Sequence, residues 1–153
     1  MKRVSVWDLD GTVICSLHRY KTINGKIDLA HWRANQHLAG LDSLLPLAKT
    51  YQEDLQDPDC YVVAATARVM NEPDFTFVRD VLGQPDHIIS RPAHETRSGA
   101  VLKVAGLNKL LSLKQFATAK KNMVYYEDNV QYLKAVCDFF KCRGVYCPSE
   151  QGH

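Results

Sequence analysis

The sequence predicts a three-layer α/β fold whose central sheet is mainly parallel and has five strands. Three observations support this. Short apolar runs alternate with segments of helical spacing along the whole chain, charged and hydroxyl residues gather where apolar runs end, and no internal repeat or low-complexity segment interrupts the pattern. At 153 residues the chain has the length of one domain, so we expect residues 1–153 to form a single unit.

The five predicted strands are short and apolar, and they are expected over residues 3–8, 60–65, 85–90, 122–126 and 143–147. The second run, Cys-Tyr-Val-Val-Ala-Ala, has no polar alternation, which is typical of a strand buried on both faces. Helices are expected between them, over residues 38–55, 71–83, 99–113 and 132–140.

Residues 13–37 interrupt this alternation just after the first strand, and we expect them to form a flap or minimal cap. Asn24-Gly25 is a strong hairpin signal. The flap also carries basic and aromatic side chains, namely His18, Arg19, Tyr20, Lys21 and Lys26. They could contact a nucleic-acid backbone or stack on a base, although a solvated hairpin with scattered charge explains them about as well.

Composition limits the possible classes of protein. Hydrophobic residues make up 46% and charged residues 24%, and the net charge of +2 comes without long Lys/Arg blocks. No stretch reaches the ~20 apolar residues that cross a bilayer, so we expect a cytoplasmic protein without membrane contact. Cys137, Cys142 and Cys147 could contribute to a zinc site, but the expected change from helix to strand between them favours reduced thiols.

Reactive side chains follow three of the predicted strands. They are Asp8 and Asp10 after the first strand, Thr66 and Arg68 after the second, and Glu127 and Asp128 after the fourth. Because the carboxyl ends of parallel strands meet at one edge of a sheet, we expect these groups to surround one site.

Carboxylates grouped in this way suit chemistry on a phosphate monoester. A phosphate dianion repels a carboxylate, so attack on phosphorus requires a cation. Mg²⁺ prefers oxygen ligands, and we expect the side chains of Asp8 and Asp128 and the backbone carbonyl of Asp10 to bind it. Gly11 would allow the tight turn that points both early aspartates at the site.

The expected roles then differ between residues. Asp8 would attack phosphorus, and Asp10 would act as general acid and then as general base. Thr66 would donate a hydrogen bond to a phosphate oxygen, and Lys103 would offset the negative charge. Lys109 and Lys114 compete with Lys103 for that role. Each feature alone has a purely structural explanation, since an Asp-x-Asp-Gly turn is often only a loop.

Together these residues resemble the haloacid dehalogenase superfamily, whose four motifs correspond to Asp8-Leu9-Asp10-Gly11-Thr12, Thr66-Ala67-Arg68, Lys103 and Glu127-Asp128. The resemblance implies a Rossmann-like fold, an aspartyl-phosphate intermediate and magnesium. The form of the first motif is the one found in phosphatases and phosphotransferases.

Residues His94 to Lys103 are similar, more narrowly, to the 3′-phosphatase domain of phage-type polynucleotide kinase. The spacing of Thr96-Arg97 from Lys103 makes Arg97 a candidate phosphate contact, next to Thr66, Ala67, Arg68 and Lys103 in the substrate site. Ala67 replaces a common glycine. Glu127 replaces the first of two aspartates, which assigns it to positioning Lys103 rather than to binding metal.

The sequence therefore predicts a magnesium-dependent phosphomonoester hydrolase with an open site, because the intervals between motifs leave no room for a large cap. Polynucleotide 3′-phosphate ends are the first candidate substrate. Free nucleotides or other small phosphorylated metabolites are the alternative. A different class, a magnesium-binding regulatory module without turnover, is disfavoured by the intact Asp8, Asp10, Thr66 and Lys103. The sequence indicates no oligomeric state.

Overall fold

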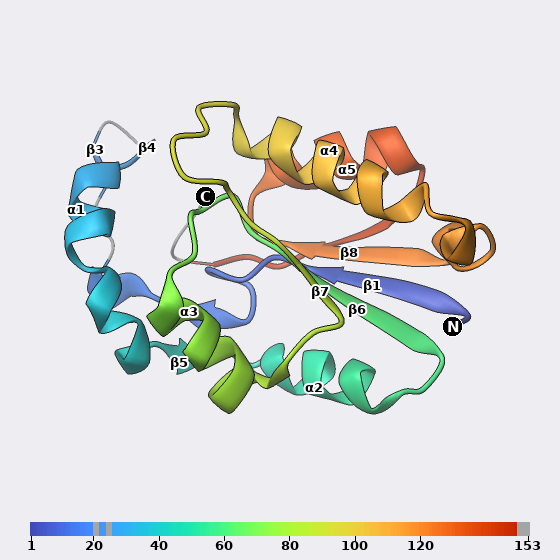
Figure 1. Ribbon diagram of the computed structural model, residues 1–153, viewed down its shortest axis with the longest axis horizontal. Coiled ribbons are helices and arrows are strands. Elements are labelled where there is room, and N and C mark those ends of the chain that lie inside the picture. Colours follow the sequence, from blue (N-terminus) through green and yellow to red (C-terminus); the bar gives the residue numbers. More distant parts are fainter. Residues whose placement is uncertain (20–21, 24–25, 150–153) are drawn as a thin grey trace.

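A computed structural model describes residues 1–19, 22–23 and 26–149. Within these ranges the central sheet has five strands in the order β7-β6-β1-β8-β9, and every neighbouring pair is parallel (Figure 1). The strands are β1 (Arg3–Trp7), β6 (Cys60–Ala65), β7 (His87–Ile89), β8 (Met123–Glu127) and β9 (Arg143–Tyr146). The predicted parallel sheet is confirmed.

Helices cover both faces of this sheet, which makes the three predicted layers. One face is covered by α4 (Gly99–Leu111) and α5 (Val130–Phe140), and the opposite face by α2 (Ala48–Gln56) and α3 (Glu72–Phe77), which continues as the π-helical turn η3 (Val78–Gly83) (Figure 1). Two short 3₁₀ turns, η4 (Lys114–Phe116) and η5 (Ala119–Lys121), connect α4 to β8.

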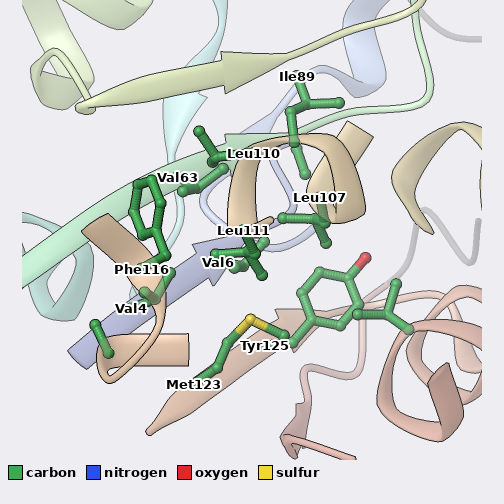
Figure 2. Close-up of a cluster of buried hydrophobic side chains, with 13 residues drawn as sticks. Val4, Val6, Val63, Ile89, Leu107, Leu110, Leu111, Phe116, Met123 and Tyr125 are labelled. Carbon is green, nitrogen blue, oxygen red and sulfur yellow. The ribbon is translucent and has the colours of Figure 1, made fainter. Parts of the chain in front are cut away.

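Alternation along the strands divides the buried side chains between the two faces. In β6, Val63 and Ala65 pack with α4 and α5, whereas Val62 and Ala64 pack with α2 and α3. Figure 2 shows the first of these two clusters, with Leu107, Leu110 and Leu111 of α4 lying against β1, β6 and β8. Burial on both faces explains why the central strands are apolar without interruption.

The predicted helix over residues 38–55 is wrong in its first half. Residues Gln36–Leu41 form a 3₁₀ turn, η2, and Ser43–Leu44 form a short strand, β5; α2 begins only at Ala48. Pro46 is the local reason, because a residue before proline is disfavoured in the helical region. The tertiary reason is that β5 pairs antiparallel with β2 (Ile14–Cys15).

The segment between β2 and β5, residues 16–42, is called the insertion below. It contains η1 (Leu17–Arg19), β3 (Thr22–Ile23), β4 (Lys26–Ile27), α1 (Leu29–Ala34) and η2. The predicted hairpin is present, since β3 pairs antiparallel with β4. Its turn at Asn24-Gly25 lies outside the described residues, as do Tyr20 and Lys21. The insertion adds helical turns to the hairpin that the sequence predicts.

The start of α1 follows from a single side chain. The carboxylate of Asp28 accepts hydrogen bonds from the backbone N–H groups of Ala30 and His31, at 3.1 and 3.2 Å. An N-cap of this kind satisfies donors that the first helical turn leaves unpaired. In the described ranges, no helix combines the length and the apolar character needed to cross a membrane.

Candidate active site

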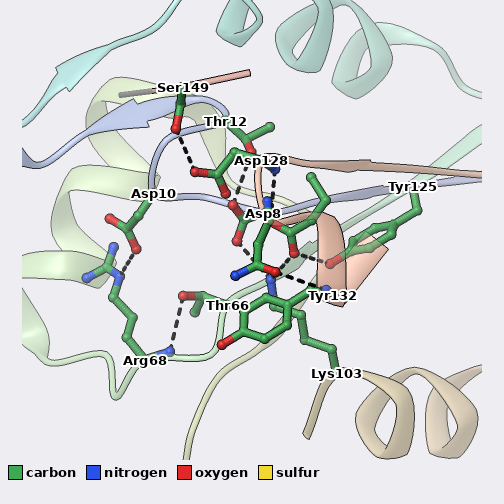
Figure 3. Close-up of polar contacts among 12 residues, drawn as sticks. Asp8, Asp10, Thr12, Thr66, Arg68, Lys103, Tyr125, Asp128, Tyr132 and Ser149 are labelled. Carbon is green, nitrogen blue, oxygen red and sulfur yellow. Dashed lines mark hydrogen bonds and ion pairs between the residues drawn. The ribbon is translucent and has the colours of Figure 1, made fainter. Parts of the chain in front are cut away.

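The reactive residues lie where β1, β6 and β8 end. These three strands are neighbours and run in the same direction, with β1 in the middle. The chain passes from β1 to β6 on one side and later reaches β8 on the other, so strand order reverses here. Asp8, Thr66 and Asp128 each follow one of these strands and come together in Figure 3.

Lys103 lies at the centre of the site and is completely buried. Its Nζ donates to Asp8 Oδ1 at 2.8 Å and to Glu127 Oε1 at 2.6 Å. The rings of Tyr132 and Tyr125 lie 4.9 and 5.9 Å from the ammonium group. Burial opposes the charge of the ammonium, but Asp8 and Glu127 outweigh it and raise the pKa of Lys103 well above its usual value.

This contact distinguishes Lys103 from the two other candidate lysines, and the predicted role of Lys103 in offsetting phosphate charge stays a prediction. Lys109 and Lys114 are exposed, whereas Lys103 reaches Asp8 from the first turns of α4. An unpaired buried ammonium would cost several kcal/mol, so its two carboxylate partners are needed for stability as well as for chemistry.

Both carboxylate oxygens of Glu127 are occupied by protein groups. Oε1 accepts from Lys103 and from the Tyr125 hydroxyl, and Oε2 accepts from the backbone N–H groups of Asp128 and Asn129 at 3.0 and 3.3 Å. Burial, and then the nearby Asp8 carboxylate, raise the pKa of Glu127 to about 7. These contacts suit a residue that positions Lys103.

Asp128 has an oxygen to spare. Its Oδ2 accepts from Ser149 Oγ at 2.7 Å, while its Oδ1 is buried and has no hydrogen-bond partner among the described residues. Burial, and then the charge of Asp8, raise the pKa of Asp128 to about 10. A cation bound here would relieve both the unpaired oxygen and the repulsion between the carboxylates.

Asp8 is the carboxylate that keeps its charge. It is buried, and its Oδ2 accepts from Thr12 Oγ1 at 3.0 Å. Burial works against ionisation, but the Lys103 charge and hydrogen bonds to its neighbours outweigh it and hold the pKa of Asp8 below its usual value. An ionised carboxylate is the form that can attack phosphorus.

The donors present fit a divalent cation. One oxygen from each of Asp8, Glu127 and Asp128 lies within 4.8 Å of the others, and two of these carboxylates, Asp8 and Glu127, pair with Lys103. Because Glu127 is fully hydrogen-bonded, Asp8 and Asp128 are the side chains with capacity to hold Mg²⁺. No group of cysteines that could hold a metal ion occurs in the described ranges. The Sγ atoms of Cys137 and Cys142 lie 3.8 Å apart, but Cys147 Sγ donates to the carbonyl of Val145.

Asp10 lies on the other side of the turn and faces Arg68 (Figure 3). Its Oδ2 lies 2.6 Å from Arg68 Nε, and its Oδ1 accepts from Ser16 Oγ at 2.8 Å. Arg68 also forms an ion pair with buried Asp74 of α3. The ring of Trp32, from α1 of the insertion, lies 5.2 Å from the guanidinium carbon of Arg68. The insertion therefore touches the core beside Asp10.

The loop after β6 is fixed by hydrogen bonds. Thr66 is buried, and its Oγ1 accepts from the Arg68 backbone N–H at 3.3 Å. Arg91 donates to the backbone carbonyls of Ala67 at 2.6 Å and Arg97 at 2.7 Å. The Arg97 side chain is 53% exposed and pairs with Glu95 at 3.1 Å, so its predicted contact with phosphate stays a prediction.

Several residues of the site were not singled out from the sequence. They are Thr12, Ser16, Trp32, Asp74, Arg91, Tyr125, Tyr132 and Ser149. Thr12 belongs to the first motif, so its position could have been noticed. Ser149 has no local signal, because its contact with Asp128 depends on how the chain folds.

Comparison with known proteins agrees with this geometry. The sequence model of the bacteriophage T5 5′-deoxynucleotidase family matches residues 1–141. The chain belongs to this family. A relative from Escherichia phage T5, named 5′-deoxynucleotidase, is 35% identical over 85 residues. That match covers 52% of this chain and only 35% of the relative.

Solved structures show the same fold. A chain of the Pnkp1/Rnl/Hen1 RNA repair complex has a TM-score of 0.70 at 16% identity, covering 97% of this chain and 43% of that one. CbbY from Rhodobacter sphaeroides in complex with phosphate has a TM-score of 0.63 at 17% identity, covering 100% and 89%. A haloacid dehalogenase-like family protein from Streptococcus pneumoniae has a TM-score of 0.63 at 11% identity, covering 97% and 87%. The predicted haloacid dehalogenase fold is confirmed.

Proposed function

We propose that this protein is a magnesium-dependent phosphohydrolase that removes the phosphate of deoxynucleoside 5′-monophosphates through Asp8. The observation that carries the proposal is the buried group of Asp8, Lys103, Glu127 and Asp128, which holds one ionised carboxylate beside a candidate cation site. The choice of a nucleotide substrate rests on the family match over residues 1–141. The family match favours the second of the substrate classes that the sequence suggests, free nucleotides, over polynucleotide 3′-phosphate ends.

In the first step an Asp8 carboxylate oxygen attacks phosphorus. The bond from phosphorus to the sugar oxygen breaks, and the phosphoryl group is transferred to Asp8 as an acyl phosphate. The leaving sugar oxygen takes a proton from Asp10. The products of this step are the nucleoside and the aspartyl-phosphate.

In the second step a water molecule attacks the phosphorus of the aspartyl-phosphate. Asp10 accepts a proton from that water, and the bond between phosphorus and the Asp8 oxygen breaks. Inorganic phosphate leaves, and Asp8 returns to its ionised form. Each of the two carboxylates is restored, so the cycle needs no further reactant.

The surrounding residues control charge and geometry. Lys103 keeps Asp8 ionised and faces the negative charge that the phosphoryl group brings. Bound Mg²⁺ would add positive charge against the phosphate oxygens. Arg68 pairs with Asp10 and Asp74, which supports a role for Arg68 in positioning Asp10. This role is additional to the contact with phosphate that the sequence predicts for Arg68.

A second candidate substrate is a polynucleotide 3′-phosphate. The exposed side chain of Arg97 favours this substrate. Arg91 donates hydrogen bonds to the backbone carbonyls of Arg97 and Ala67, and so holds the Arg97 loop close to the loop that contains Thr66. An exposed guanidinium near the phosphate-binding loop could contact a neighbouring nucleotide of a longer chain. The third candidate, a magnesium-binding module without turnover, would use the same cluster and lack hydrolysis.

A substrate panel distinguishes the three candidates. Phosphate release with Mg²⁺ would be measured for deoxynucleoside 5′-monophosphates, deoxynucleoside 3′-monophosphates, and oligonucleotides phosphorylated at the 3′ or the 5′ end. We expect the 5′-monophosphates to react fastest, by about tenfold or more, since one substrate contact is worth about 1–3 kcal/mol.

Asp8→Asn is the control for contaminating phosphatases, and it should release no phosphate while still unfolding cooperatively. Preference for the 3′-phosphorylated oligonucleotide would support the second candidate instead. Absence of release from every substrate by pure wild-type protein would support the module without turnover.

A further inference from the structure

We propose that Ser149 is a positioning residue for the cation site: its hydroxyl holds one oxygen of Asp128 so that the other remains available to a divalent cation. The inference rests on the proposed function in taking that cation to be Mg²⁺. Ser149 lies after the last strand, far from the four motifs in the sequence, and no motif predicts a role for it.

Backbone pairing brings the C-terminal segment to the site. Beyond β9, the N–H of Cys147 donates to the carbonyl of Glu127 at 2.8 Å, which extends the pairing of β9 with β8 by one more hydrogen bond. Cys147 is buried, and Pro148 restricts the backbone after it. Ser149 is therefore delivered next to the residue that follows Glu127, which is Asp128.

The two oxygens of Asp128 have different surroundings. Oδ2 accepts from Ser149 Oγ at 2.7 Å, and Oδ1 is buried without a hydrogen-bond partner in the part of the chain that the structure describes (Figure 3). A buried oxygen without a partner is costly, and a cation would remove that cost. The pattern is that of a carboxylate fixed by one oxygen and open to a ligand at the other.

The contact is also packed tightly. Gly11, in the turn after β1, has a φ of +84°, and a Cβ added there would lie 2.1 Å from Asp128 Oδ2 and 2.7 Å from Ser149 Oγ. The turn, the C-terminal segment and Asp128 thus meet at one point. Ser149 Oγ therefore lies against the turn as well as against Asp128.

Mg²⁺ requires near-octahedral coordination, so small rotations of a ligand carboxylate weaken binding. Loss of a hydrogen bond that orients a metal ligand typically lowers metal affinity by about 10–100-fold. We therefore expect Ser149→Ala to bind Mg²⁺ about 10-fold or more weakly than the wild type, and Ser149→Thr, which keeps the hydroxyl, to bind it within about threefold of the wild type.

The test measures metal binding without any substrate. Mg²⁺ affinity would be determined by calorimetry, and Mn²⁺ affinity by electron paramagnetic resonance, for the full-length wild type and both variants. Ser112→Ala is the matched control, because Ser112 is exposed at the end of α4 and its Oγ donates to the Lys109 carbonyl. Thermal unfolding with a chelator checks that each variant is folded.

An affinity of Ser149→Ala within twofold of the wild type would overturn the proposal. So would a Ser149→Thr variant as weak as Ser149→Ala, since the hydroxyl would then not be the group that matters. These readings are independent of hydrolysis, so they remain decisive even if the substrate panel finds no turnover.

Discussion

Two aspartates that are two positions apart have opposite surroundings in this site. Asp8 is paired with Lys103 and lies beside Glu127 and Asp128, while Asp10 is paired with Arg68 on the far side of the turn. A nucleophile must be ionised and close to the cation, whereas a general acid must be able to hold a proton near the leaving group. The two aspartates of the first motif therefore have different partners, and their separate roles as nucleophile and general acid are proposals.

Replacing Asp10 tests its role as the acid. In Asp10→Asn, we expect formation of the aspartyl-phosphate from a deoxynucleoside 5′-monophosphate to slow by about 10²–10⁴-fold. With p-nitrophenyl phosphate the loss should be less than about tenfold, because p-nitrophenolate leaves without a proton. Single-turnover kinetics with both substrates would measure this difference, and Mg²⁺ affinity should stay close to that of the wild type.

Asp138→Asn is the matched control, since Asp138 is exposed on α5 and pairs only with Lys134. Equal losses with both substrates would show that Asp10 does not protonate the leaving group. Normal turnover of the nucleotide would exclude Asp10 from catalysis altogether.

At the scale of elements, the turn after β1 connects fold and chemistry. Gly11 takes a left-handed backbone conformation that costs other residues about 1–2 kcal/mol. Its Cα also faces Asp128 so closely that no side-chain carbon fits between them. The turn thus lets the end of β1 approach the end of β8, and the candidate cation site depends on that approach.

Gly11→Ala should therefore lose both stability and cation binding. We expect a decrease of at least about 1–2 kcal/mol in the free energy of unfolding, from the backbone conformation alone. We also expect a clear loss of Mg²⁺ affinity, because Asp128 must move away from the new methyl group. Chemical denaturation and calorimetry would measure the two effects.

Gly40→Ala provides the comparison, because nothing lies within 4 Å of a Cβ added at Gly40. Its stability and Mg²⁺ affinity should stay close to those of the wild type. A Gly11→Ala variant that behaves like Gly40→Ala would show that the turn can shift without cost, and that the close approach to Asp128 is not needed.

At the scale of the molecule, the insertion is separate from both hydrophobic clusters. One cluster joins the sheet to α4 and α5, and the other joins it to α2, α3 and η3. Neither includes a residue of 16–42 among those that the structure describes. The ends of the insertion are adjacent, since Cys15 pairs with Ser43. It contacts the rest of the molecule near the site through Ser16, which donates to Asp10, and through Trp32 over Arg68, and its η2 packs against α3. The insertion therefore divides its contacts between the site, at Asp10 and Arg68, and α3 on one face of the sheet.

Deletion of residues 17–41, with a short glycine-serine linker in their place, tests this division. We expect cooperative unfolding to persist at a lower temperature, because the sheet and both clusters remain while α3 loses its packing against η2. Mg²⁺ binding should persist, because the acidic group remains. The kcat/KM for the nucleotide should fall by about tenfold or more, since Arg68 loses Trp32 and holds Asp10 less firmly. Turnover of p-nitrophenyl phosphate should fall less.

Loss of cooperative unfolding in this variant would show that the insertion is part of the folding unit. An equal loss of activity with both substrates would show that the insertion does not act through Asp10.

The sequence by itself determined the five strands, most of the helices and the positions of the motif residues. It could do so because these features depend on neighbours in the chain: apolar runs, proline and glycine signals, and carboxylates directly after a strand. The carboxyl ends of parallel strands lie at the same edge of a sheet, so the sequence alone could predict that Asp8, Thr66 and Asp128 lie close together.

Only the tertiary structure showed that Lys103 contacts Asp8 while Lys109 and Lys114 are exposed, and only it showed where residues 38–47 leave the helical path to pair with β2. It also joined Arg68 to Asp10 and Ser149 to Asp128. These choices depend on packing between segments far apart in the chain. A side chain's neighbours in space are fixed by the whole fold, and local sequence patterns carry no record of them.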